Sequence, residues 1–202
     1  MKIIGIGMNY AEHNKELNAA TPMQPVVFMK PDSALLRENK PFFLPDFSSE
    51  IHYEVEVVLK INRLGKNIAP QFASRYYDEF ALGVDFTARD LQNDFRVKGF
   101  PWELAKGFDN SAVVSSFLPM KDYEKNNISF RLDINSKTVQ TGNTANMIYS
   151  FDEIIAYVSR FFTLKIGDLI FTGTPAGVGK VAINDVLEGY VENQKMFSFK
   201  IK

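Results

Sequence analysis

Two glutamates separated by one residue are the first candidates for chemistry in this chain. Glu54 and Glu56 lie in the run IHYEVEVVL, where β-branched residues alternate with polar ones as in a strand. Strand side chains repeat every second residue, so both carboxylates leave from one face, roughly 6 to 7 Å apart. Asp85, at the end of a second expected strand, would add a third oxygen ligand, and such ligands favour Mg²⁺, Mn²⁺ or Ca²⁺. An isolated E-x-E pair is also typical of a solvated strand face.

A histidine and a glutamate form the second candidate pair. His13 and Glu16 are three residues apart in the segment AEHNKE, so a helix that starts after Asn9 places them on one face. There the carboxylate would orient the imidazole and stabilise its charged form, which makes the pair a general base for a water molecule. The same spacing also occurs in surface helix contacts that have no catalytic role.

Three further polar side chains are candidates for anion binding. Arg89 and Gln92 are three residues apart on an expected helix, and Lys106 lies in the irregular stretch PWELAKGFD. Three carboxylates and one divalent ion leave a net negative charge, so an acidic substrate needs cations nearby. Arg89 and Lys106 would supply them. Each of these side chains, taken singly, is also consistent with a solvated polar residue.

The composition excludes several classes of function. The 202 residues include 23 basic and 24 acidic side chains, so no charge bias favours nucleic acid or a membrane surface. The absence of cysteine excludes disulfides, thiolate metal sites and a cysteine nucleophile. No apolar run is long enough for a signal sequence or a membrane-spanning helix. We expect a cytoplasmic protein with a single catalytic domain over residues 1–202 that binds a small anionic molecule.

The hydrophobic pattern predicts an α+β chain with many strands and a few short helices. A capping box of Thr87 and Asp90 is expected to open the helix that follows the second candidate strand. Residues 31–50 contain three prolines, which predicts a long surface segment. Long loops often serve a site, so the function of this segment as a lid over the site is left open. The patterns predict strands at 25–30, 51–61 and 81–87, helices at 69–80 and 87–98, a hairpin at 128–142, and a helix at 151–162.

Two glycine-containing segments do not fit nucleotide-binding motifs. A dinucleotide fingerprint that begins with Gly5 and Gly7 would need a third glycine where the chain has Tyr10. In the segment GTPAGVGK the glycine spacing is one residue too long for a phosphate-binding loop, and Val181 replaces the hydroxyl residue. A tight turn is the better interpretation of that segment.

Seven segments, taken in order, resemble successive blocks of the fumarylacetoacetate hydrolase family. They are NYAEHNKE, PVVFMKP, IHYEVEVVL, GVDFTARDLQ, GFPWELAKGFD, TVQTGNTANMI and IGDLIFTGTPAGVG. The sequence is most similar to the short, single-domain acylpyruvase and oxaloacetate decarboxylase-like branch. The resemblance implies a mixed β-sandwich or β-roll with a few short helices, and a homodimer.

The resemblance also implies roles for particular residues. The implied metal ligands are Glu54, Glu56 and Asp85. The implied catalytic residues are His13, Glu16 and Lys106. The implied substrate-binding residues are Arg89, Gln92 and Thr174.

The function implied by the resemblance is cleavage of carbon–carbon bonds in small 2-oxo or 1,3-dioxo carboxylic acids. The cofactor would be Mg²⁺ or Mn²⁺, with Ca²⁺ as an alternative. Acylpyruvate hydrolysis and oxaloacetate decarboxylation both pass through a metal-stabilised enolate, and the sequence does not rank them. Two other functions remain open. One is an isomerase or hydratase of 2-hydroxy-diene-dioates from aromatic catabolism, and the other is a non-catalytic module that binds metal and keto acid.

Overall fold

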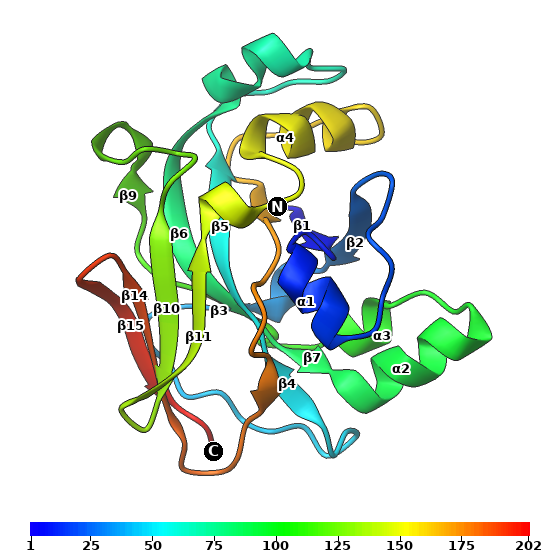
Figure 1. The fold of residues 1–202 in the computed structure, drawn as a ribbon, viewed down its shortest axis with the longest axis vertical. Helices are drawn as coiled ribbons and strands as arrows, with labels where there is room; N and C mark the ends of the chain where they lie inside the picture. The colour runs from blue at the N-terminus through cyan, green and yellow to red at the C-terminus, as the bar shows by residue number, and fades with distance from the viewer.

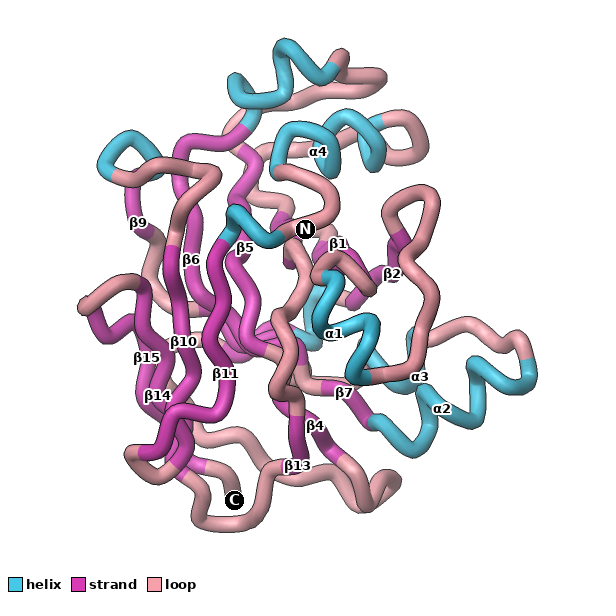
Figure 2. The backbone as a smooth tube through the Cα atoms, viewed as in Figure 1, coloured by secondary structure: helices cyan, strands magenta, loops and turns pink.

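The computed structural model describes all 202 residues, and most of its regular structure is short strands. Figure 2 shows strands and loops over most of the backbone, with the helices confined to a few short segments. The strand-rich α+β class predicted from the sequence is confirmed. The strands are β1 (Ile3–Gly7), β2 (Val26–Lys30), β3 (Leu35–Leu36), β4 (Ile51–Tyr53), β5 (Val55–Ile61), β6 (Tyr77–Asp85), β7 (Thr87–Ala88), β8 (Ala112–Val114), β9 (Leu118–Pro119), β10 (Ser129–Ile134), β11 (Lys137–Asn143), β12 (Leu169–Phe171), β13 (Gly179–Lys180), β14 (Val186–Val191) and β15 (Gln194–Lys200).

The helices are few and short. None of them combines the length and the apolar character needed to cross a membrane. They are α1 (Ala11–Glu16), α2 (Arg89–Lys98), α3 (Glu103–Lys106) and α4 (Phe151–Ser159), with 3₁₀ turns at Asp32–Ala34, Pro70–Tyr76, Met120–Asp122 and Thr144–Asn146.

Three sheets form the framework. The largest is mixed, with the order β2-β1-β12-β5-β6-β8-β3 and β9 paired to β6. A four-stranded antiparallel sheet has the order β11-β10-β14-β15, and a small sheet has the order β13-β4-β7. In Figure 1 the four-stranded sheet lies beside β5 and β6, while α1, α2 and α3 gather on the other side of the molecule. This arrangement agrees with the predicted β-sandwich or β-roll.

Alternate residues of the central strand β5 face different surroundings. Val55 and Val57 belong to the large apolar core that includes side chains of the four-stranded sheet. Val58 belongs to a separate, smaller apolar cluster on the opposite side of the strand. Because side chains alternate along a strand, Glu56 points to the side of Val58, away from the large core. The same alternation on β6 turns Asp85 to that side. One face of β5 and β6 therefore packs into the large core, and the opposite face carries the carboxylates.

Two predicted element boundaries are wrong. The helix expected at 69–80 is instead a 3₁₀ turn over Pro70–Tyr76, and the strand expected from residue 81 begins at Tyr77 as β6. Tyr77 and Phe80 pair with β5 and bury their rings in the core, which draws this segment into the sheet. The single strand expected at 51–61 is interrupted at Glu54, since β4 pairs with β7 and β13 while β5 pairs with β6 and β12.

The capping box expected at the start of α2 is also absent. The residue before the helix is Ala88, and no side chain caps the first turn. The Thr87 hydroxyl instead accepts a hydrogen bond from the Lys106 ammonium at 2.6 Å. A capping box does exist at α4, where Ser150 and Glu153 bond to each other's backbone N–H groups.

Candidate metal centre and active site

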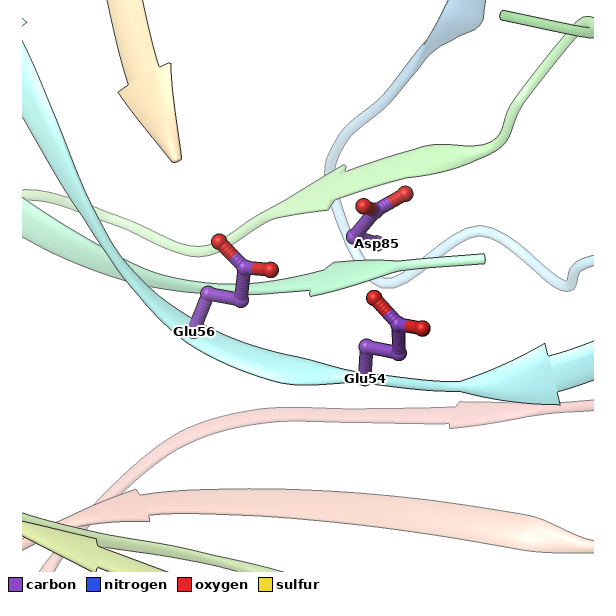
Figure 3. A group of neighbouring side chains, drawn as sticks. All are labelled: Glu54, Glu56 and Asp85. Carbon is purple, nitrogen blue, oxygen red and sulfur yellow. The ribbon is translucent and has the colours of Figure 1, made fainter. Parts of the chain in front are cut away.

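Three buried carboxylates from neighbouring strands meet at one point. Figure 3 shows the side chains of Glu54, Glu56 and Asp85 gathered on adjoining strands, and one ligand oxygen from each lies within 4.8 Å of the others. Glu56 comes from β5 and Glu54 from the break that precedes it, while Asp85 ends the adjacent strand β6. The Asp85 N–H donates to the Glu54 carbonyl at 2.8 Å, which fixes the two strand ends side by side. The structure therefore brings together the three carboxylates that the sequence pattern singled out.

Two of the predicted cationic residues pair with these carboxylates. The Lys106 ammonium, at the end of α3, lies 2.8 Å from Oε2 of Glu54 and 2.7 Å from Oδ2 of Asp85. The Arg89 guanidinium, at the start of α2, pairs with the other oxygen of Glu54 and donates to Oε1 of Gln92 at 2.5 Å. All of these side chains are buried, so none is an ordinary solvated charge.

A third cation, Lys30, belongs to the same cluster and was missed in the sequence. It is the last residue of β2, and its ammonium lies 2.6 Å from Oδ1 of Asp85. The ammonium also donates to Oγ of Ser111 at 3.0 Å and to the carbonyl oxygen of Lys106. Lys30 therefore ties Asp85 to the segment that carries Lys106. The sequence shows this lysine in the motif FMKP. A lysine at the end of a strand and before a proline is usually solvated, so the motif alone does not indicate burial.

The charges of this cluster cancel. Three carboxylates face the cationic groups of Lys30, Arg89 and Lys106, and all six side chains are buried. A divalent cation would turn this neutral group into one with two positive charges. That excess favours an acidic ligand, as expected from the sequence. Arg89 and Lys106 alone would leave one positive charge, and Lys30, which the sequence did not reveal, adds the second.

The pKa shifts of Glu54 and Glu56 are those expected at a binding site for a hard divalent cation. Burial raises the pKa of Glu54, but the charges of Lys106 and Arg89 outweigh burial and hold that pKa well below its usual range. Burial and the charges of Asp85 and Glu54 raise the pKa of Glu56 well above its usual range. The Glu56 side chain has a single hydrogen bond, from the Gly173 N–H at 2.7 Å. Glu56 thus lacks a neighbouring countercharge of its own, and a divalent cation among these oxygens would supply it.

His13 and Glu16 form the expected pair on α1. Nδ1 of His13 lies 3.3 Å from Oε2 of Glu16, and the two oxygens of Glu16 also accept from the Gly177 N–H at 3.2 and 3.1 Å. Because Nδ1 is engaged with Glu16, Nε2 is the ring nitrogen available to a substrate or a water. His13 is only 4% exposed, so its ring position is set by packing as well as by this contact.

Thr174 is placed by a side chain that sequence reasoning missed. Its hydroxyl donates to the Val55 carbonyl at 2.9 Å and accepts from Nε2 of Gln140 at 2.9 Å. Gln140, buried on β11, also accepts from the Val55 N–H at 2.9 Å and donates to the Pro175 carbonyl at 2.9 Å. Gln140 therefore connects the four-stranded sheet to the break beside Glu54, and no local pattern in TVQTG signals that role.

One pocket connects the predicted groups. Its lining includes seven of the nine predicted site residues, and the other two, Glu16 and Asp85, contact members of that lining. Met8, Leu17, Arg96 and Trp102 also line it, and none of these four was expected from the sequence. Glu54, Glu56, Arg89, Lys106 and His13 therefore face a common space, and Asp85 and Glu16 contact it from behind.

The strand-rich fold places a buried acidic triad and a histidine pair at one pocket, an arrangement suited to an enzyme that acts on a small ligand. The chain belongs to the fumarylacetoacetate hydrolase family, because the family model described as "Fumarylacetoacetate (FAA) hydrolase C-terminal" matches residues 2–198. The family resemblance stated from the seven sequence segments is confirmed.

Named relatives cover almost the whole chain. The mitochondrial oxaloacetate tautomerase FAHD1 of Mus musculus is 39% identical over 201 residues, which is 99% of this chain and 91% of the relative. The oxaloacetate tautomerase YcgM of Escherichia coli is 38% identical over 188 residues, 92% of this chain and 86% of the relative. A crystal structure of fumarylpyruvate hydrolase from Pseudomonas aeruginosa in complex with Mn²⁺ and pyruvate superposes with a TM-score of 0.94. It is 31% identical and covers 100% of this chain and 89% of that one. These relatives support an enzyme that acts on keto acids.

Proposed function

We propose that this chain is a divalent-metal-dependent enzyme that forms and uses enolates of small 2-oxo carboxylic acids. The observation that carries the proposal is the common pocket, in which an all-oxygen acidic triad faces a histidine with a free ring nitrogen. A non-catalytic binding module is a weaker explanation, because a binder has no use for a base positioned by Glu16 and Gly177.

The triad and its cations would hold the acid end of the substrate. When bound, a divalent cation at Glu54, Glu56 and Asp85 would polarise the 2-oxo group and stabilise negative charge on its oxygen. The buried Arg89 guanidinium has N–H groups beyond those bonded to Glu54 and Gln92, and these would donate to the substrate carboxylate. The Lys106 ammonium would exchange one of its three bonds, to Glu54, Asp85 and Thr87, for a bond to a substrate oxygen. Their present pairing with Glu54 and Asp85 holds both cations at that end of the pocket.

The histidine pair would move the proton. For an acylpyruvate, Nε2 of His13 takes a proton from water, and the resulting hydroxide attacks the distal carbonyl carbon. The carbon–carbon bond then breaks toward the pyruvate fragment, its electron pair forms the enolate, and the proton held by His13 returns to that fragment. The products are pyruvate and a carboxylic acid. Glu16, fixed by the Gly177 N–H, stabilises the imidazolium in the intervening step.

Oxaloacetate tautomerisation is the second candidate, favoured by the names of the relatives. In that reaction a proton leaves the enol oxygen and another joins the adjacent carbon, and no bond between carbons breaks. Decarboxylation of oxaloacetate releases carbon dioxide and leaves the pyruvate enolate, the same enolate that acylpyruvate hydrolysis forms, but without water. The groups that bind the acid end would therefore support it too. Isomerisation of a 2-hydroxy-diene-dioate would be a variant of this proton transfer. This alternative is supported by a 5-carboxymethyl-2-hydroxymuconate delta-isomerase structure from Mycobacterium smegmatis, which superposes with a TM-score of 0.87 at 30% identity.

The deciding assay measures pyruvate release from acetylpyruvate and from oxaloacetate, with Mg²⁺ or Mn²⁺ and with a chelator. The enol absorbance of oxaloacetate is followed in parallel to detect tautomerisation. Metal-dependent turnover of any of these reactions supports the proposal and ranks the reactions. Lack of turnover in all three assays, with the metal bound, would favour the binding module instead.

A further inference from the structure

Arg96 is the one cationic side chain of the pocket lining without an acidic partner. Arg89 and Lys106, the other two, pair with Glu54 and Asp85. The Arg96 guanidinium forms no ion pair and no hydrogen bond with the rest of the chain, although it lines the same pocket. The only carboxylates in that lining are Glu54 and Glu56, at the metal end. The charge of Arg96 is therefore free to meet an anion from solution.

The helix α2 places Arg96 at a defined distance from the metal end. Arg89, Gln92 and Arg96 follow the i, i+3, i+7 spacing of one helical face, and all three line the pocket. With a rise of 1.5 Å per residue, Arg96 begins about 10 Å along the axis from Arg89. Helical side chains lean toward the N-terminus, so the guanidinium can reach back over the turn of Gln92. The axial separation of about 10 Å, less this backward reach, is comparable with the length of an extended acid of a few carbons.

Apolar side chains from other segments line the pocket beside the polar groups His13, Gln92 and Thr174. Met8, Leu17, Ala19 and Trp102 contribute side chains to the pocket, and none of them offers a charged group. Arg89 and Lys106 pair with the triad and His13 pairs with Glu16, so a second carboxylate on the substrate tail would find its unpaired cationic partner in Arg96. A purely apolar tail would find no partner for that cation and would leave it hydrated.

We propose that Arg96 binds a second, distal carboxylate, and that the enzyme therefore prefers 2-oxo diacids to 2-oxo monoacids of equal chain length. The inference rests on the proposed function, because it assumes that the 1-carboxylate and 2-oxo group bind at the triad. The charge of the site agrees with it, since the buried cluster would carry two positive charges with a divalent cation bound, before Arg96 is counted. Arg96 is thus assigned as a specificity-determining residue at the end of the pocket opposite to the triad.

The test compares two ligands that differ only at the distal end. Mg²⁺-loaded protein is titrated with 2-oxoadipate and with 2-oxohexanoate, and binding is read from the fluorescence of Trp102, the only tryptophan of the chain, which lines the pocket. A charge-assisted hydrogen bond predicts that wild type binds the diacid about ten-fold more tightly. Arg96→Gln should bring that ratio close to one, and Arg96→Lys should restore part of it.

Lys98→Gln is the matched control. Lys98 is exposed on the same helix, pairs with Asp94 at 2.8 Å, and lies outside the pocket lining. Its loss removes one positive charge from α2 as Arg96→Gln does, so a general electrostatic effect would appear in both variants. The proposal expects the ratio of affinities to stay at the wild-type value in Lys98→Gln.

The outcomes separate this inference from the proposed function. Equal affinities in wild type, or a preference that survives Arg96→Gln, would overturn the role of Arg96, while turnover of acetylpyruvate would leave the proposed function standing. A preference that disappears with Arg96→Gln in a protein without turnover would support the ligand class and overturn the reaction. Failure of the Mg²⁺-loaded protein to bind either acid would overturn both.

Discussion

The two ends of the pocket handle charge in different ways. At the inner end, which is the end with the triad, three buried carboxylates lie among three buried cations, and each cation has a carboxylate partner. At the other end, exposed Arg96 has no partner and sits among apolar side chains. A buried charge must be paired or it destabilises the fold, whereas an exposed one is nearly free of that constraint. The inner end is thus fixed by folding and determines the chemistry, while the outer end can vary and select the substrate.

The largest expected effect follows from removing a ligand at the inner end. Glu56→Ala should abolish metal binding and activity together, because two carboxylates and three cations remain where a metal needs negative oxygen donors. Calorimetric titration with Mn²⁺ and the pyruvate-release assay measure the two properties. The control is Glu12→Ala, since Glu12 is exposed and pairs only with Lys15. Activity that survives Glu56→Ala in metal-stripped buffer would refute the ligand assignment.

The histidine pair should affect one reaction more than the others. His13→Ala removes the base that activates water, so acylpyruvate hydrolysis should fall by roughly 10²- to 10⁴-fold. Metal binding should persist, because no triad oxygen bonds to His13. Oxaloacetate decarboxylation, which needs no water, should be spared. Equal loss of hydrolysis and decarboxylation would contradict the division of roles between the triad and the pair.

Lys30 tests whether the inner end is held by charge pairing. Lys30→Met removes one partner of buried Asp85 and should cost about 3 kcal/mol in the free energy of unfolding. For a chain of this length that loss lowers Tm by roughly 6 to 12 °C, measured by calorimetry without metal. Arg96→Gln at the other end should change the stability by less than about 0.5 kcal/mol. Wild-type stability in Lys30→Met would show that Lys106 alone satisfies Asp85.

The sequence predicted the triad because alternation along a strand is local. Glu54 and Glu56 followed from a two-residue period, and His13 with Glu16 followed from a helical period. Lys30 could not be found in this way, because its burial depends on Asp85, Ser111 and backbone oxygens far along the chain. The same limit explains the break at Glu54, since nothing in the run 51–61 shows that its two halves pair with different strands.

Arg96 is a different kind of omission. Its spacing from Arg89 and Gln92 was visible in the sequence and could have placed it on the same helical face. What the sequence does not show is that this face lines a pocket over its whole length, because Met8, Leu17 and Trp102 come from other segments. Periodicity therefore identified the face, and only tertiary structure identified its surroundings.

The smallest expected effect concerns residues 31–50, the segment for which a lid was an open alternative. No residue of this segment lines the pocket. Phe42 is buried and stacks on Phe86 at 4.0 Å between ring centroids, and the Leu44 N–H donates to the Lys202 carbonyl at 2.8 Å. Near the end of the segment, Ser48 donates to Asp90 at 2.7 Å. These contacts tie the segment to the core, to the last residue of the chain and to α2, so we expect it to act as a brace.

A brace and a lid differ in how ligand binding changes access to the backbone. Trypsin can cleave after Arg37, which is exposed within the segment. Since the segment lies outside the pocket, the rate of that cleavage should be the same with and without saturating Mg²⁺ and oxalate. Cleavage after Arg96, which lines the pocket, should instead slow when a 2-oxo diacid is bound. Marked protection at Arg37 by Mg²⁺ and oxalate would show that residues 31–50 close over the inner end of the pocket. The inner end would then depend on a ligand-induced movement as well as on the charge pairing that folding fixes.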